Sequence, residues 1–299
     1  MAVVAPTQDK PEPIRRRSRL AETWLYLRRS KSGMLGFTIL VIHLLIALAS
    51  PFIAPYDSTA IDAALIYKSP SREHLFGTDE FGRDVFTRVL LGGRIALAVT
   101  IVATAIAVMW GGSVGILLGF LGGRTDEAAM RVVDAFLAAP YILFLLLIIS
   151  ALGRSNTILI ITLGFFYGIA VVRVSRSATL DFVARDFITA ARARGERRMT
   201  IVLRELLPNV LDILLVEFAM RWSWMLLAFS SLSFLGFGVS PPTPDWGLMI
   251  AEGRKALRLA PWTAIFPMIA LSTLVIGINL SADAVAKALG LDRTQGAPV

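Results

Sequence analysis

The chain has 299 residues, of which 56% are hydrophobic and 17% charged, and its mean hydropathy is +0.67. Soluble domains carry about 25% charged residues, so this composition excludes an ordinary water-soluble fold. A net charge of +8 can indicate nucleic-acid binding, but in a chain this apolar it favours basic loops on the cytoplasmic side of a membrane. The absence of cysteine excludes disulfides, thiolate metal sites and cysteine nucleophiles.

The chain begins with a basic tail, residues 1–33. Its first part, residues 1–19, is rich in proline and arginine and lacks apolar periodicity, which predicts a disordered segment near anionic lipid headgroups. A first apolar run follows at 34–54. A cleaved signal peptide ending near Ala49 is the alternative, but its basic region and its apolar core of more than ~7–15 residues would both be unusually long.

Six predominantly apolar runs are long enough to cross a bilayer, which takes roughly 20 helical residues. The predicted spans are 34–54, 95–121, 132–152, 156–180, 209–235 and 262–282. None alternates polar with apolar residues, which disfavours the strands of a barrel. We therefore expect an all-α membrane protein with six transmembrane helices.

The positions of lysine and arginine predict the orientation of these spans. Basic residues gather in the tail 1–33, in the loop 181–208 and at 286–299, and such residues stay preferentially in the cytoplasm. Both termini are therefore predicted to be cytoplasmic. The segments 55–93 and 236–261 then lie outside the cell.

The second predicted span carries a stripe of small residues. Gly111, Gly115, Gly119 and Gly123 recur at four-residue spacing, so they share one helical face. Small residues on one face let a neighbouring helix approach closely, and such packing drives helix association in lipid. This stripe predicts a helix–helix contact.

The residues of common enzyme sites are missing or scattered. His43 and His74 are far apart in sequence, so hydrolytic triads and zinc sites are excluded or very weak. None of the five lysines follows a glycine, as the lysine of a phosphate-binding loop does. We expect no enzyme activity and no cofactor in this chain, so uphill transport would draw its energy from a partner or an ion gradient.

The predicted cytoplasmic loop contains a spaced motif. Ala190 and Ala191 precede Gly195, and Leu207 and Pro208 follow it at twelve and thirteen residues. A short helix from Thr189 can end at Gly195, a suitable left-handed cap, and a new span can start near Pro208. The small alanines would leave room for docking into a groove of a partner. The alternative is a solvated arginine-rich loop that merely follows the positive-inside rule.

This pattern resembles the "EAA" loop of ABC importer permeases. Thr189 replaces the acidic residue of that loop and Glu205 stands where an apolar residue or histidine is common, but the Ala-Ala, Gly and Leu-Pro frame is intact. The segments 32–57 and 231–250 resemble the C-type subunit of oligopeptide/dipeptide permeases. The same branch carries a GTDxxGRD signature, here Gly77, Thr78, Asp79, Gly82, Arg83 and Asp84.

The resemblance implies a type I ABC importer permease fold over 94–285, in the inner membrane of a bacterium. It implies a second, B-type permease completing the pore, two ATPase subunits that carry ATP and magnesium, an external solute-binding protein, and no nucleic-acid partner. In that family the loop at 189–195 transmits ATPase motion to the fourth and fifth spans. The implied solute is a di- or oligopeptide, with a nickel complex, an opine or an oligosaccharide as alternatives. An ion-coupled carrier or a membrane anchor fits less well.

Two charged groups stand out as candidate sites. Glu217 and Arg221 lie four residues apart near the middle of the fifth span, where an unpaired charge costs about 2.5–3.5 kcal/mol. They either pair with each other inside the bundle, or Arg221 faces the pathway and attracts a carboxylate of the solute. Asp79, Glu80, Arg83 and Asp84 form an external cluster that either stabilises a turn and caps a helix or contacts the solute-binding protein.

Overall fold

The computed structural model describes residues 30–291. The predictions for most of the N-terminal tail and for the last eight residues lie outside that range. The described part is all-helical apart from an isolated bridge between Thr78 and Asp84. This outcome confirms the all-α class.

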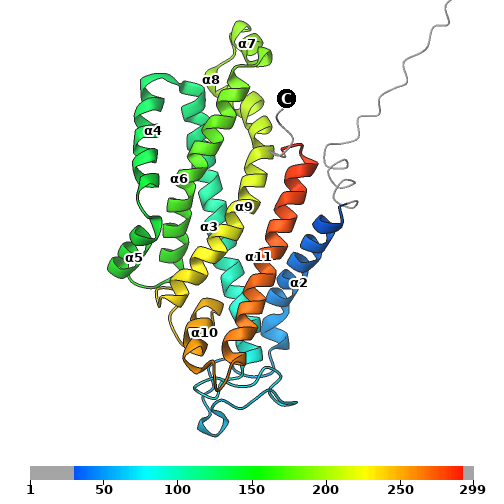
Figure 1. Cartoon of the computed structure of the whole chain (residues 1–299). Coiled ribbons are helices and arrows are strands. Elements are labelled where there is room, and N and C mark those ends of the chain that lie inside the picture. Colours follow the sequence, from blue (N-terminus) through cyan, green and yellow to red (C-terminus); the bar gives the residue numbers. More distant parts are fainter. Residues whose placement is uncertain (1–29, 292–299) are drawn as a thin grey trace, which may run out of the picture.

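The helices form an elongated bundle with short elements at both ends (Figure 1). In chain order they are α2 (Lys31–Ile53), α3 (Val85–Leu121), α4 (Gly123–Ala138), α5 (Tyr141–Leu152), α6 (Asn156–Val183), α7 (Asp186–Ala193), α8 (Arg198–Ile201), α9 (Leu207–Phe234), α10 (Trp246–Gly253) and α11 (Trp262–Ala288). Short turns of other pitch are η1 (Ala63–Leu65), η2 (Val202–Leu206) and η3 (Arg254–Ala256). The start of α2, the end of α11 and α7 lie at one end, whereas α10 and residues 54–84 lie at the other (Figure 1).

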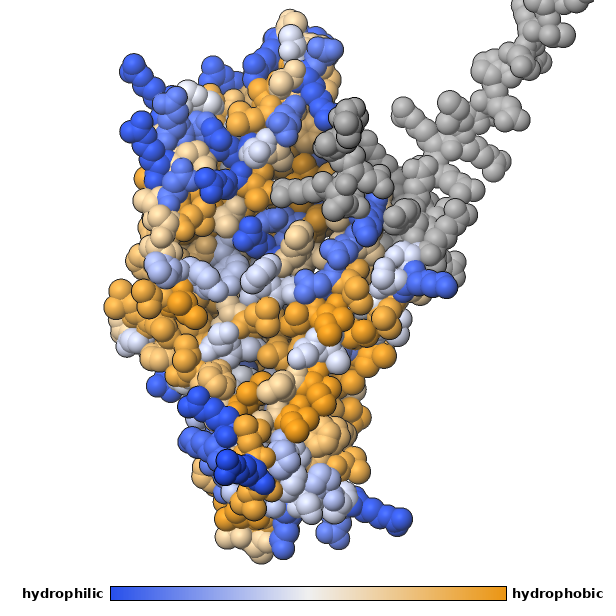
Figure 2. Space-filling view, in the orientation of Figure 1, coloured by the Kyte–Doolittle hydropathy of each residue, from blue (hydrophilic) through white to orange (hydrophobic). Residues whose placement is uncertain are grey.

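Four helices of the described chain, α2, α3, α6 and α11, are long and apolar enough to cross a membrane. The pair α4 and α5 makes a fifth candidate if it counts as one broken span. The 28-residue helix α9, where the sequence predicts a span at 209–235, is not among these candidates. Figure 2 shows an apolar band across the middle of the molecule with more polar surfaces toward both ends.

The third predicted span, 132–152, is not one helix, which corrects the sequence prediction. Helix α4 ends at Ala138, α5 begins at Tyr141, and the two axes are bent by 84°. Pro140 explains the break, because a residue that precedes proline is driven out of the helical region, and Ala139 has φ −90° and ψ 145°.

The second helix also differs from its predicted extent of 95–121. Helix α3 begins at Val85, because the side chain of Asp84 accepts a hydrogen bond from the backbone N–H of Thr87 and caps the helix. The helix therefore starts within the segment 55–93 that the sequence predicts to be external, and its 37 residues are more than one membrane span requires.

The glycine stripe of α3 packs against α6, as its spacing predicts for three of the four glycines. A methyl group on Gly111 would collide with the carbonyl oxygen of Gly168, and one on Gly115 with the hydroxyl of Ser175. A methyl group on Gly119 would lie 2.9 Å from the carbonyl oxygen of Arg176. The two backbones are thus in near contact, and only glycine leaves the space.

The fourth glycine, Gly123, does not belong to this contact. It has a φ of +67°, and a methyl group added to it would have no neighbouring atom within 4 Å, because Gly123 forms the start of α4 after α3 has ended. Its positive φ, rather than close packing, favours glycine there.

Helix α2 lies along α11 at the edge of the bundle. A methyl group on Gly36 would come 2.7 Å from the backbone nitrogen of Ser281, and one on Gly277 would come 2.7 Å from a methyl group of Ile39. The opposite face of α2 is exposed, with Leu48 at 74% and Phe52 at 89%. We infer that this face is directed toward lipid, because it is apolar and lies on a candidate span.

Candidate functional site

The motif-bearing loop 181–208 is folded. Helix α7 ends at Ala193, Arg194 is its C-cap, and Gly195 follows with a φ of +73°. The N–H of Gly195 donates to the carbonyl of Arg192 at 3.0 Å, and that of Glu196 donates to the carbonyl of Ala191 at 3.2 Å. These two bonds satisfy carbonyls that a helix end would otherwise leave free. The predicted helix end at Gly195 is confirmed.

Helix α7 has one buried and one exposed face. Ile188 and Ala191 are fully buried in a hydrophobic cluster that joins α3, α6, α7, α8, η2 and α9. Thr189, Ala190 and Gly195 are exposed. The expectation that both alanines leave room for a partner is therefore wrong for Ala191, which packs against the chain's own core.

The second half of the loop continues directly into α9. The N–H of Leu207 donates to the carbonyl of Val202, five residues back, so η2 is a wide π-type turn. Pro208 follows in the first turn of α9 and is exposed, and a proline there has no N–H to donate to the preceding turn. Leu207 is half-buried on the cluster that holds α7.

The arginines of this loop are exposed. Two of them lie over aromatic rings, Arg192 at 5.4 Å from the centroid of Phe120 and Arg185 at 4.6 Å from that of Phe182. The guanidinium of Arg194 pairs with Glu196 at 2.6 Å. A merely solvated loop would lack the buried core beneath α7, so we name residues 186–195 the elbow and treat it as a candidate docking element.

The second candidate site is the Glu217–Arg221 pair on α9. The guanidinium of Arg221 donates to the carboxylate of Glu217, with side-chain exposures of 24% and 12%, respectively. The shared helical face that the spacing predicts is confirmed. Tyr167 of α6 lies nearby and donates to the carbonyl of Trp224 at 3.4 Å. The pair is charge-compensated but open to one side of α9.

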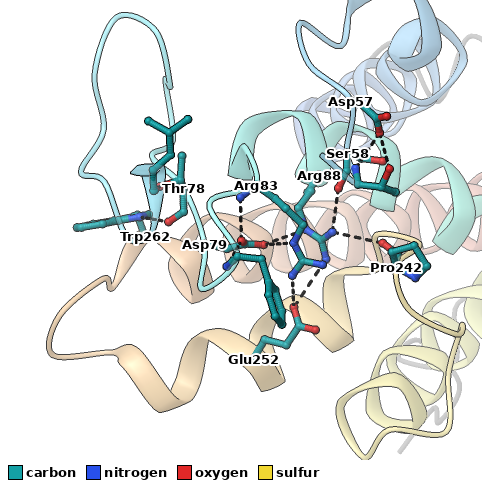
Figure 3. Close-up of polar contacts among 12 residues, drawn as sticks. Asp57, Ser58, Thr78, Asp79, Arg83, Arg88, Pro242, Glu252 and Trp262 are labelled. Carbon is teal, nitrogen blue, oxygen red and sulfur yellow. Dashed lines mark hydrogen bonds and ion pairs between the residues drawn. The ribbon is translucent and has the colours of Figure 1, made fainter. Parts of the chain in front are cut away.

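The third candidate is a network of four charges at the opposite end of the bundle (Figure 3). Arg83 donates to Asp79 at 2.7 Å and to Glu252 at 3.2 Å. Arg88, which is fully buried, lies 3.5 Å from Asp79 and 3.7 Å from Glu252. Because the sequence predicts this end to be external, we call these four residues the external network.

Arg88 also joins the backbone of two separate loops. Its Nη1 donates to the carbonyl of Ser58 at 3.1 Å and to that of Pro242 at 3.4 Å (Figure 3). One side chain thus ties α3 to residues 54–84, to the loop before α10 and, through Glu252, to α10. The sequence predicted Asp79 and Arg83 but missed Arg88 and Glu252. The one available signal was a charged residue, Arg88, just before the second apolar run.

The remaining motif residues have local structural roles. Asp84 caps α3 and also contacts the imidazole of His74 at 2.9 Å. The carbonyl of Thr78 accepts a bond from the indole N–H of Trp262 at 3.1 Å, and Gly77 has a φ of +70° beside that ring. Gly82, with a φ of +74°, has no room for a methyl group beside the carbonyl of Asp62. For Asp79, Arg83 and Asp84, the interpretation of the cluster as ion-paired turns and a helix cap is confirmed.

Two carboxyl groups at this end of the bundle, Glu252 of the network and Asp245 at the start of α10, have raised pKa values. Burial raises the pKa of Glu252 above its ordinary value, although Arg83 and Arg88 oppose that shift. Burial also raises the pKa of Asp245 to about 6, against hydrogen bonds that favour the carboxylate. Asp245 caps α10, accepting from the N–H of Leu248 at 3.1 Å. Within residues 30–291 no group of His, Asp and Glu side chains could hold a metal ion.

These features describe a helical protein with several candidate membrane spans, an ordered elbow at one end and an ion-paired charge network at the other. Residues 111–293 match the family described as "Binding-protein-dependent transport system inner membrane component". Residues 18–70 match the N-terminal transmembrane domain of oligopeptide transport permease C. The chain belongs to this family of binding-protein-dependent inner-membrane permeases.

Individual relatives agree with that assignment. The chain is 36% identical to the glutathione transport system permease protein GsiD of Escherichia coli strain UTI89 and of Shigella dysenteriae serotype 1. Each alignment spans 281 residues, which is 94% of this chain and 92% of the relative. The protein is therefore a transport subunit rather than an enzyme.

Substitution of Arg88 by methionine should destabilise the fold by about 3–5 kcal/mol, because it leaves buried carboxylates with one cation fewer. The measurement is thermal unfolding of the purified full chain. Arg94→Met, at an exposed position of the same helix, is the matched control and should change little. Equal stabilities of the two variants would contradict the structural role of Arg88.

The raised pKa of Asp245 should make stability depend on pH. Its folded-state pKa of about 6 exceeds the reference value of 3.8, so the protonated form is favoured on folding and stability falls as pH rises between these values. Asp245→Asn, which keeps a capping oxygen, should gain stability over the parent as pH rises, by up to about 3 kcal/mol above pH 6. A difference between variant and parent that stays constant from pH 4 to about 7 would contradict this assignment.

Proposed function

We propose that this chain is the pore-forming, C-type permease subunit of an ATP-driven importer in the plasma membrane of a bacterium, and that it carries di- or oligopeptides. Two observations support the solute class. Residues 18–70 match a family named for oligopeptide transport, and the relatives are named for transport of glutathione, itself a small peptide. A nickel complex, an opine or an oligosaccharide is the alternative, because the solute-binding protein selects the solute in this branch.

We infer six spans with both termini in the cytoplasm. In this arrangement α4 and α5 together form the third, broken span and α9 forms the fifth. The ends of α2 and α11 that lead to the termini lie on the same side as the arginine-rich elbow, which supports the orientation (Figure 1).

The proposed complex contains a B-type permease, two ATP-binding subunits that carry ATP and magnesium, and an external solute-binding protein. The exposed surface of α9 supports the proposal that a second permease contacts this helix. Twelve of the 28 residues of α9 are buried, whereas Leu215, Met220 and Trp224 are exposed by 58%, 45% and 61%. A helix with charges at mid-length needs a protein or a water-filled pathway on its open side, because lipid would leave Glu217 and Arg221 poorly solvated.

The two faces of the elbow are the observation that carries this proposal. The buried face, with Ile188 and Ala191, packs on a core shared by α3, α6 and α9. A displacement of the exposed face would therefore move these helices together. ATP-driven closure of the ATPase subunits would thus bias the bundle between two arrangements with different access. No bond-making residue is required in the pore.

An ion-coupled carrier is the second candidate. Such a carrier relies on buried acidic residues in its pathway, and Glu217 is one, but here it is neutralised by Arg221. Copurification separates the two candidates, since an importer subunit brings down ATPase subunits and a carrier does not.

Substitution of Ala190 by tryptophan should abolish copurification of the ATPase subunits, because a large ring on the exposed face of α7 would block docking. The readout is the amount of ATPase recovered with the tagged permease. Ala60→Trp, at an exposed site on the opposite end of the molecule, is the control and should recover ATPase normally. Normal recovery with Ala190→Trp, in a variant that folds and is expressed normally, would contradict docking at the elbow.

For the pathway we propose that Arg221 attracts a carboxylate of the solute. Arg221→Met alone leaves Glu217 uncompensated, whereas the double variant with Glu217→Gln removes both charges. Recognition predicts that both variants raise the solute concentration for half-maximal uptake by about tenfold, equivalent to 1.4 kcal/mol. A purely structural pair predicts that the double variant regains normal uptake, and that result would refute the recognition role.

A further inference from the structure

An apolar cavity of about 240 Å³ lies between helices α2, α3, α10 and α11. It is near the end of the bundle that carries α10, and it is separate from both the elbow and the Glu217–Arg221 pair. Aliphatic and aromatic side chains form almost all of its wall, and no charged residue lines it.

The few polar atoms at its wall are already engaged. The indole N–H of Trp246 donates to the carbonyl of Val89 at 2.8 Å. The imidazole of His43 lies 2.9 Å from the carbonyl of Ile39 and 3.3 Å from the hydroxyl of Thr273. Water needs polar partners, and an apolar cavity of roughly 150 Å³ stays dry and takes up apolar molecules instead. A larger cavity of this kind therefore favours an apolar ligand.

The cavity arises where the close packing of α2 on α11 ends. Gly36 and Gly277 bring the helices together, and farther along α2 the imidazole of His43 lies 3.2 Å from the carbonyl of Ala270. Farther along, Ala47 and Ala270 line the space with one methyl group each.

Aromatic rings close the cavity on the side of the polar loops. Phe76 stacks on Phe266 with 3.8 Å between ring centroids, and it meets Phe86 edge-on at 5.0 Å. All three rings line the cavity. The rim, by contrast, is open: Ile46 and Ile269 are exposed by 37% and 52%, and each lies on a candidate membrane span. The rim therefore faces the hydrocarbon of the bilayer.

We propose that this cavity is a lipid site that holds one acyl chain of a phospholipid from the leaflet on the α10 side. The chain would enter between α2 and α11 past Ile46 and Ile269. It would replace the missing packing against Ala47, Ala270 and the buried residues Val89 and Leu97 of α3. This inference rests on the membrane setting of the helices and is independent of the solute.

The test uses the full chain in nanodiscs of phosphatidylethanolamine and phosphatidylglycerol, with a photoreactive diazirine on an acyl chain of the phosphatidylethanolamine. After illumination, mass spectrometry locates the labelled residues. Label on Val89 or Leu97, which are 8% and 3% exposed, is the expected result, because a chain reaches them only from within the cavity. Label confined to outward residues such as Leu48 and Phe52 would overturn the proposal.

Two variants fill the cavity from different helices, Ala270→Phe and Ala47→Leu. Each should lose label on Leu97 while keeping label on Leu48. Ile276→Phe adds a ring at an exposed site of α11 outside the cavity and should leave the pattern unchanged. Persistent label on Leu97 in both filled variants, each shown to be monodisperse, would refute the site, as would a cross-link from Leu97 to a second permease in the assembled transporter.

Discussion

The fold depends on the near contact of the backbones of α3 and α6. In lipid there is little hydrophobic force to bring helices together, so association relies on close packing and on interhelical hydrogen bonds. Gly111 and Gly115 supply that closeness, and the indole N–H of Trp110 adds a bond to the carbonyl of Gly164 at 3.0 Å. Two residues of the external network, Arg83 and Arg88, lie at or just before the start of α3, and the elbow follows the end of α6. The contact between α3 and α6 therefore determines the positions of both sites.

The two ends of the bundle use charge in opposite ways. At the α10 end the charges of Arg83, Arg88, Asp79 and Glu252 are mutually compensated and mostly buried, which fixes residues 54–84, the loop before α10 and α10 itself relative to α3. At the elbow end the arginines are exposed and the apolar side chains beneath them are buried. The first arrangement holds loops in place. The second presents an exposed surface on a buried apolar core, which suits the role proposed for the elbow in transmitting motion.

Helix α9 lies between these ends and shares features with both. Its buried side, with Met225, Phe229 and Leu232, is part of the main core, whereas its open side exposes Trp224 near the Glu217–Arg221 pair. A helix buried on one side and charged at mid-length is suited to line a pathway completed by another subunit. The cavity beside α2 has the reverse character, since its wall is almost entirely apolar and its rim lies on two candidate membrane spans.

Several features were predictable from the sequence because they depend on residues close together in the chain. The four-residue spacing of Gly111 and Gly115 reports a shared helical face, the same spacing joins Glu217 to Arg221, and a glycine after a short helix, Gly195, reports its cap. The class of the fold followed from the apolar runs, because only helices satisfy their own backbone hydrogen bonds across a bilayer in such runs.

Tertiary structure alone decided what depends on distant partners. Arg83 and Glu252 are separated by 169 residues, and no local pattern shows that their side chains meet. The burial of Ala191 on the inner face of α7 and the space left beside Ala47 and Ala270 likewise follow from how helices pack. Local spacing determines which side chains share a face of a helix, whereas the close packing of helices determines what that face meets.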